Sequence, residues 1–270
     1  MRTAFVFGLI ALSFSVSAFA AEGATSVQQS DSLLNHITAT YSATVHGPGM
    51  TQLDQNIASD RNGVKSKSAI NLDGGVYALY MFDDRWGVGP EVPFVYAPSS
   101  ATDNFTIGDV GVRIANKGII KTRELTVAAN LILQAPTNAY SISRHMDMGL
   151  KFTPNARYSF SGTRFSVGAL SEFKSYLGAT FDKGFKAWMA PYASYRLTST
   201  LSANLLYSYE ADHFVGQPGM QFRMYQTDLE PGLVWFITPK IMFNPYLQVF
   251  TTKQLSWEHT ALGAVVSASL

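Results

Sequence analysis

The stretch ALYMFDDRWGVGPEVPFVY, residues 78–96, decides the fold that we expect of this chain. Apolar side chains alternate with other residues on both sides of the charged turn at 83–85, which indicates the two strands of a hairpin. Tyr80, Phe82 and Trp86 lie close to that turn. Such a turn, bordered by rings and continued by apolar alternation, is typical of a membrane hairpin whose aromatic side chains lie at the headgroups.

The same pattern recurs along the chain, and short connections alternate with long ones. In outer-membrane barrels the short turns face the periplasm and the long loops face outward. We therefore predict an all-β fold, a transmembrane antiparallel up-and-down β-barrel of about twelve strands. The expected strands are 36–46, 69–82, 86–96, 106–115, 124–135, 147–160, 164–175, 185–197, 201–210, 225–237, 241–250 and 260–270.

The N-terminus has the pattern of an export signal. A positive start is followed by an apolar run at 4–16 and by the A-x-A motif at 18–20, which predicts a signal peptide over 1–20. An N-terminal membrane anchor is the alternative, but the run is short for a spanning helix. We expect 21–32 to be a periplasmic tail, 33–270 to be the barrel, and the cleaved chain to lie in the cell outer membrane.

Composition supports a surface that meets lipid. Charged residues make up 14% of the chain and aromatic residues 13%, which is poor in charge and rich in rings for a water-soluble surface. There is no cysteine, so disulfides do not hold the core. The net charge of +1 argues against a nucleic-acid partner. The expected partners are outer-membrane lipid, a small-molecule solute and the barrel-assembly machinery, although the chain ends on Leu270 where many barrels end on Phe or Trp.

A soluble barrel also alternates, so the position of the aromatic residues separates the two classes. Tyr158 and Phe160 lie beside the same short turn as Phe165, and Trp235 beside the same turn as Phe243. A girdle of this kind suits a membrane interface and has little purpose in a soluble barrel.

The polar face of the predicted strands carries charges of both signs. One interpretation is an internal salt-bridge network that holds the wall and partly blocks the lumen; the other is a channel whose acidic and basic strips select small solutes. The sequence leaves both open. The predicted lumen-lining residues are Asp73, Glu91, Asp109, Arg113, Lys151, Arg157, Glu172, Lys174, Arg196, Glu210, Asp228 and Glu230.

We predict no catalytic residues, no metal site and no cofactor. The sequence contains no HExxH, GxSxG or glycine-rich phosphate loop. Residues 145–148 are a poor ligand set because neighbours on a strand point to opposite faces. An outer-membrane hydrolase acting at the rim through His46, His213 or His259 is an alternative function, as is a structural or adhesive barrel with a closed lumen.

Six prolines lie inside predicted strands. A closed barrel has no edge at which a missing N–H is harmless, so we expect bulges or kinks at these positions. The prolines are Pro90, Pro93, Pro154, Pro191, Pro231 and Pro245.

Two segments resemble a known family. The stretch 82–89, FDDRWGVG, leading to Val92-Pro93-Phe94, and the stretch 108–112, GDVGV, followed by LQAPT at 133–137, are similar to transporter-like outer-membrane proteins linked to the meta-pathway of phenol degradation. The resemblance covers about residues 78–137. It implies uptake of small, often hydrophobic, compounds, and with the residue patterns it predicts a passive outer-membrane channel or transporter for small molecules.

Overall fold

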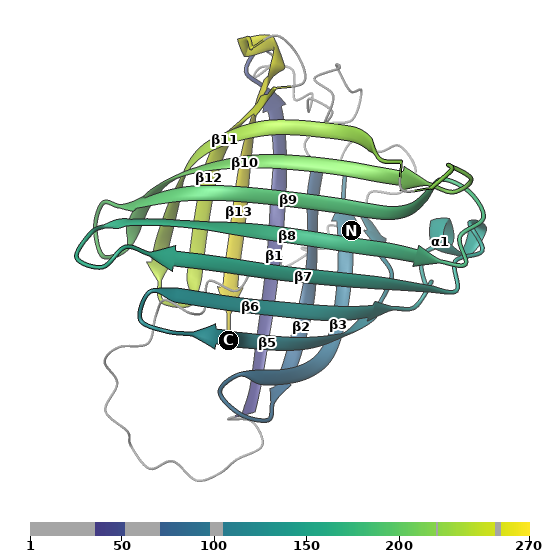
Figure 1. Ribbon diagram of the computed structural model, residues 1–270, viewed down its shortest axis with the longest axis horizontal. Helices are drawn as coiled ribbons and strands as arrows, with labels where there is room; N and C mark the ends of the chain where they lie inside the picture. Colours follow the sequence, from purple (N-terminus) through teal and green to yellow (C-terminus); the bar gives the residue numbers. More distant parts are fainter. Residues whose placement is uncertain (1–35, 52–70, 98–104, 220, 252–254) are drawn as a thin grey trace, which may run out of the picture.

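The computed structural model describes residues 36–51, 71–97, 105–219, 221–251 and 255–270 (Figure 1). The predicted signal peptide, the predicted periplasmic tail, most of the predicted loop 47–67 and nearly all of the predicted loop 97–104 lie outside these residues.

The described residues form a closed antiparallel barrel of 12 strands, as predicted. Each strand pairs with its neighbours in the chain, and the pairing of β1 with β13 joins the two ends of the sheet. The short β4 and the longer β5 pair with successive parts of β3, so together they take one position in the wall. The strands are β1 Ile37–Gly49, β2 Asn71–Met81, β3 Trp86–Tyr96, β4 Phe105–Ile107, β5 Gly111–Lys121, β6 Leu125–Gln134, β7 Met148–Ser159, β8 Phe165–Leu177, β9 Lys183–Arg196, β10 Leu201–Phe214, β11 Arg223–Thr238, β12 Ile241–Phe250 and β13 Thr260–Ser269.

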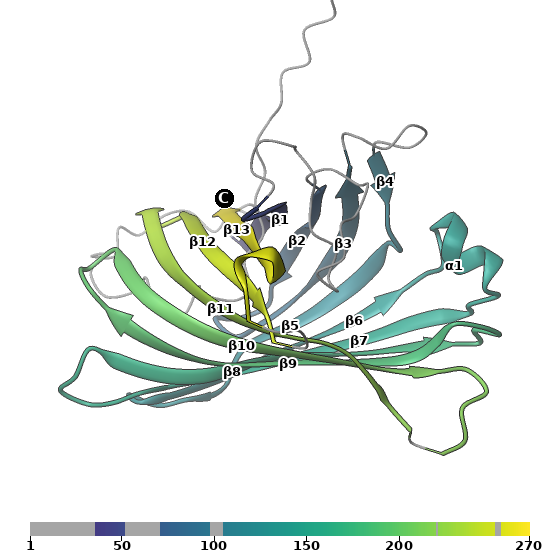
Figure 2. The ribbon, with the colours of Figure 1, turned by 90° about the horizontal axis from the view of Figure 1, so that it is seen from above.

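The strands are steeply inclined, as closure into a barrel requires. In Figure 1 the wall formed by β6–β10 crosses in front of the wall formed by β1–β3 and β13. Figure 2, seen from above, shows β8–β10 on one side and β1–β3 with β12 and β13 on the other.

The connections divide the barrel into two ends. Short turns join β2 to β3, β5 to β6, β7 to β8, β9 to β10 and β11 to β12, and we call this the short-turn end. The first of these turns is fixed by Asp83, whose carboxylate accepts the backbone N–H groups of Trp86 at 2.6 Å and Arg85 at 2.7 Å. These hydrogen bonds lower the pKa of Asp83. The other connections form the long-loop end, where α1 (Ala139–Ser143) and η3 (Trp257–His259) lie.

Large apolar side chains cover the outside of the barrel. Phe82 is 62% exposed and Trp235 is 47% exposed. Rings contact one another beside the short turns, as predicted: the centroids of Tyr158 and Phe160 are 5.0 Å apart and those of Phe160 and Phe165 are 5.5 Å apart. The outer wall therefore has the apolar surface and the aromatic girdle of a barrel that meets lipid.

Three segments differ from the predicted elements. The predicted strand 106–115 is interrupted at 108–110, and β5 continues to Lys121 past a register shift between Asn116 and Ile120. The predicted loop 136–146 contains α1, which begins after Asn138, whose side chain accepts the N–H of Tyr140. Several strands, β1 and β10 among them, run further toward the long-loop end than predicted.

The expectation of bulges was wrong at five of the six prolines. Opposite Pro93 a residue is inserted, because residues 108–110 face only two residues of β3 between the pairs Glu91–Gly111 and Phe94–Ile107. Other register shifts lie away from these prolines, between His46 and Gly49 and between Glu210 and Ala211 for example. At Pro154 the pairing with β6 is continuous, while the β7–β8 pairing omits Thr153 and Pro154 and resumes in the same register. The strand accommodates the missing N–H by losing pairing to one neighbour, without an inserted residue.

No helix among the described residues combines the length and the apolar character that crossing a membrane requires.

Candidate functional site

The polar side of the strands faces the inside of the barrel. The Nζ atom of Lys151 on β7 lies 3.1 Å from Oε1 of Glu91 on β3, although β5 and β6 separate these two strands in the sheet. Side chains of strands that are not neighbours meet only across the concave face. The residues that share this face by register therefore line the interior, and their role toward a solute is taken up under Proposed function.

Glu91 is the centre of a buried ion-pair network. Its carboxylate accepts from Arg113 Nη2 at 2.6 Å and from Arg113 Nε at 2.8 Å, while its other oxygen faces Lys151. Lys151 Nζ also lies 4.0 Å from Glu172 on β8. The Arg113 guanidinium stacks on Tyr77, 4.2 Å from the ring centroid. One carboxylate thus connects β3, β5 and β7, which holds the wall together across the lumen.

A second network joins β9 to β10. Lys183 Nζ lies 2.5 Å from Asp212 and 3.9 Å from Glu210, and Lys186 Nζ lies 3.0 Å from Glu210. Asp212 is fully buried. The two carboxylates compensate two ammonium groups on the next strand, so this part of the wall is close to neutral.

Carboxyl groups also gather on β11. Asp228 is fully buried and accepts from Gln248 Nε2 on β12 at 3.1 Å. Glu230 lies two residues further along the same strand, so its side chain is on the same face as that of Asp228. This pair makes the β11 side of the lumen acidic.

Three lysines lie in one row across β7, β8 and β9. Lys174 on β8 is directly opposite Lys151 on β7 and directly opposite Lys186 on β9. Both flanking lysines are in the ion pairs described above. The ammonium group of Lys174 lies over the ring of Tyr176, 4.7 Å from its centroid. Like charges directly opposite one another on a sheet are unfavourable, and the ion pairs of Lys151 and Lys186 offset the charge of two of the three lysines.

The connection 135–147 is fixed to the barrel mouth at the long-loop end. The Asp109 carboxylate accepts from Ser141 Oγ at 2.6 Å and from the backbone N–H of Asn138 at 3.1 Å. Arg144, 2% exposed, donates to the carbonyl groups of Phe181 and Lys183. Tyr140 on α1 donates to the Asp182 carboxylate, and this hydrogen bond raises the pKa of Tyr140.

Apolar and polar side chains both lie in the interior nearer the short-turn end. Tyr77, Leu79, Met81 and Ala115 form a buried apolar cluster, and Ser166 is buried on another strand. Tyr192 on β9 lies flat over Gly168 on the adjoining strand: a Cβ at Gly168 would be 2.5 Å from the Tyr192 hydroxyl and 2.4 Å from a backbone carbonyl. Because Gly168 has no side chain, the Tyr192 ring can lie against the barrel wall and does not extend into the lumen.

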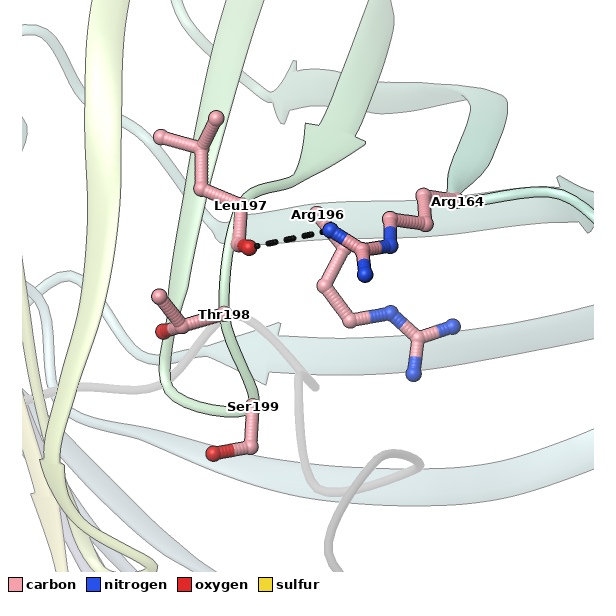
Figure 3. Close-up of a pocket in the computed structure, with 5 residues that line it drawn as sticks. All are labelled: Arg164, Arg196, Leu197, Thr198 and Ser199. Carbon is pink, nitrogen blue, oxygen red and sulfur yellow. Dashed lines mark hydrogen bonds between the residues drawn. The ribbon is translucent and has the colours of Figure 1, made fainter.

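Three arginines lie toward the short-turn end of β7, β8 and β9. Arg157 lies on β7, Arg196 ends β9, and Arg164 immediately precedes β8. Figure 3 shows Arg164 reaching toward the carbonyl of Leu197, with the side chain of Arg196 next to it and pointing away from Leu197, Thr198 and Ser199. They line a pocket of about 400 Å³ together with Leu197, Thr198 and Ser199.

The residues that the sequence predicted to line the lumen differ in how far they are buried. Five are buried, namely Glu91, Asp109, Arg113, Glu210 and Asp228. Six are partly exposed, namely Asp73, Lys151, Arg157, Glu172, Lys174 and Glu230, and Arg196 is exposed at the short-turn end. The prediction omitted Arg144, Lys183, Lys186 and Asp212. Lys186 lies an even number of residues before Arg196 in the predicted strand 185–197, so the alternation predicts that both face the lumen. The other three residues lie in segments that were predicted to be loops.

The histidines of the hydrolase alternative have different partners. His46 Nε2 lies 3.1 Å from Asp73 Oδ2, whereas His259 Nδ1 lies 3.1 Å from Ser256 Oγ. His213 Nδ1 lies 2.8 Å from the carbonyl oxygen of Gln221. The Asp73 carboxylate and the Ser256 hydroxyl thus contact different histidines.

Within the described residues, no group of three or more His, Asp or Glu side chains is placed to hold a metal ion.

Known structures share this architecture. The chain is similar to the COG4313 outer membrane channel from Pseudomonas putida F1, with a TM-score of 0.53 and 15% identity over 91% of this chain and 100% of that one. It is also similar to the NanC porin (TM-score 0.45, 8% identity, 87% and 98% covered) and to Salmonella typhi OmpF (TM-score 0.39, 7% identity, 86% and 96% covered).

No family model matches the chain, and no curated protein matches its sequence. The resemblance to the phenol meta-pathway proteins therefore stays a prediction. The similarity to the Pseudomonas putida structure concerns the fold, which is that of an outer-membrane channel.

Proposed function

We propose that the protein is a passive channel of the outer membrane for small molecules. The observation that carries the proposal is the contrast between the two faces of the closed barrel, apolar and ring-bordered outside, and charged inside. A wall of this kind stabilises a polar path through a bilayer. The similarity in fold to an outer-membrane channel supports both the function and the location.

In this proposal the short-turn end faces the periplasm and the long-loop end faces outward, as in other barrels of this class. A solute entering from outside then meets the ion-pair networks first and the arginines of the short-turn end last. The row of Lys151, Lys174 and Lys186 lies on β7–β9 and the acidic pair Asp228 and Glu230 on β11, with β10 between them. They would act on the charge of the solute rather than on its detailed shape.

A closed structural barrel is the second candidate, because one contact favours it. The ion pair of Glu91 with Lys151 spans strands that are not neighbours and so narrows the lumen. If that bridge occludes the whole cross-section, the barrel carries no solute, and its charged interior serves stability alone.

Liposome swelling distinguishes the two. The full chain is reconstituted into vesicles, and swelling is followed in isosmotic solutions of small neutral and anionic solutes. A channel gives swelling that grows with protein content and falls with solute size. Vesicles with the folded chain that swell no faster than empty vesicles would establish the closed barrel instead. A heat-dependent mobility shift on SDS gels confirms that the chain tested is folded.

A further inference from the structure

The basic residues of the interior are concentrated on one wall and end in a pair of arginines. Strands β7, β8 and β9 contain a single acidic residue, Glu172, against basic residues at six positions, with Arg164 directly before β8. The basic residues of these strands are Lys151, Arg157, Lys174, Lys183, Lys186 and Arg196.

Arg164 and Arg196 are neighbours across the β8–β9 ladder. The backbone N–H of Arg196 donates to the carbonyl of Arg164 at 2.9 Å. Like charges directly opposite on a sheet destabilise it. Arg157 adds to this, because its guanidinium is near enough to Arg196 for mutual repulsion. Three positive charges at the end of one wall are an arrangement that folding alone does not favour.

Neither rim arginine has a counter-charge in the described part of the chain. Arg164 donates through Nη1 to the carbonyl of Leu197 at 3.4 Å, and neither Arg164 nor Arg196 forms an ion pair there. Both arginines line the pocket of about 400 Å³, and the guanidinium groups keep N–H donors that no hydrogen bond within the described residues uses. The pair is complementary to a planar carboxylate or to a phosphate, which guanidinium groups bind in a bidentate manner.

The register assigns this pair to the interior. Ser166 and Ser194 are opposite one another one step further in, and Ser166 is 2% exposed. The alternate positions, Phe165 and Tyr195, are 40% and 48% exposed and point outward. The arginines share the parity of the serines, so they face the mouth of the lumen and not the acyl chains of the bilayer.

We propose that Arg164 and Arg196 form a binding site for the carboxylate or phosphate group of a small anionic solute at the short-turn mouth of the lumen. Arg157 and the lysine row continue the same wall toward the long-loop end. The inference rests on the proposed channel function for the route of its solute, but binding itself is measurable without any flux.

Citrate is a suitable probe because it carries several carboxylates and is small enough for the pocket. Isothermal titration of the detergent-purified full chain at low salt is expected to give saturable binding. Replacing both arginines, Arg164→Gln with Arg196→Gln, should weaken it about tenfold or more, since it removes two charge-assisted forks. Arg164→Lys with Arg196→Lys keeps the charge and loses the fork geometry, so its affinity should fall between the two.

The matched control is Lys121→Gln with Arg123→Gln. These two exposed residues lie at the same end of the barrel, outside the pocket, and the control removes the same amount of charge. It should bind citrate like the wild type. Each variant is checked by its heat-dependent gel mobility. No saturable binding to the wild type, or equal loss in the control and in the Arg164/Arg196 variant, would overturn the proposal.

A phospholipid headgroup offers the same chemistry as a free anion, and reconstitution separates the two. Citrate binding is compared in phosphatidylcholine vesicles with and without phosphatidylglycerol. Unchanged affinity supports a solute site in the lumen mouth. Displacement of citrate by phosphatidylglycerol would assign the arginines to the lipid and refute the solute site. Citrate binding by a chain that gives no swelling would support the site while refuting the channel function.

Discussion

Replacement of Glu91 by glutamine tests the internal network most severely. The carboxylate compensates Arg113 and Lys151, and the side chains of Glu91, Arg113 and Lys151 are 6%, 9% and 16% exposed. The Glu91→Gln variant would keep the shape of the side chain and lose its charge, leaving two cations uncompensated inside the barrel. Removing one partner of a buried ion pair costs about 3–5 kcal/mol. We expect about 3 kcal/mol, the lower end of that range, because Lys151 keeps Glu172 at 4.0 Å.

The free energy of unfolding is measured by guanidinium titration of the chain folded into vesicles, followed by tryptophan fluorescence. Asp84→Asn, at an exposed position of the first short turn, is the control and should change it by less than about 0.5 kcal/mol. Adding Lys151→Met to Glu91→Gln removes one of the two stranded cations. The double variant should therefore recover at least about 1 kcal/mol, as coupled neighbours do.

The reasoning fails if Glu91→Gln costs no more than the surface control. It also fails if the loss of stability in the double variant equals the sum of the losses caused by Glu91→Gln and Lys151→Met alone, because additivity would mean that the two side chains do not interact.

Two further predictions concern the wall and a turn. Gly168→Ala should destabilise the barrel by about 1–3 kcal/mol, because the new methyl group would crowd Tyr192. Gly184→Ala is the control and should not destabilise it, because its Cβ would lie 3.5 Å from Val215. Equal effects in the same unfolding titration would refute the packing of the Tyr192 ring on Gly168. The Glu124 carboxylate accepts from Ser161 Oγ, which lowers the pKa of Glu124. Its contribution to stability is complete above the unfolded pKa of about 4.3 and is lost as pH falls through the lower folded value. The free energy of unfolding of Glu124→Gln should therefore depend less on pH below about 4.3 than that of the wild type. Identical pH profiles for the two proteins would contradict this.

The hairpin at 78–96 shows why most of the fold was predictable. Its alternation, its turn residues and its bordering rings all follow from local physics, and β3 has the bounds that the sequence predicted. The ends of β1 and β10 were missed because those strands continue toward the long-loop end as His46-Gly47-Pro48-Gly49 and Ala211-Asp212-His213-Phe214, where apolar alternation stops. A strand that has passed the apolar belt no longer needs an apolar face, so its sequence resembles that of a loop.

The candidate site was predictable in content and not in its connections. The alternation along each strand predicted that the charged residues share one face of the sheet. The ion pair of Glu91 with Lys151 could not be predicted in this way, because it depends on the curvature that brings β3 and β7 together across two intervening strands. The sequence predicted only one member of the arginine pair as lumen-lining. Arg196 was recognised by its alternation, whereas Arg164, the first residue of the predicted strand 164–175 and a turn residue just before β8, was not included.

Conductance across a planar bilayer tests the channel function most directly. The folded full chain should give discrete current steps, and Arg157→Glu should shift the reversal potential in a salt gradient toward cation preference, because it exchanges a positive charge of the lumen wall for a negative one. Folded protein that inserts without producing current steps, or an Arg157→Glu variant with the ion preference of the wild type, would contradict the account of a channel lined by the charged interior.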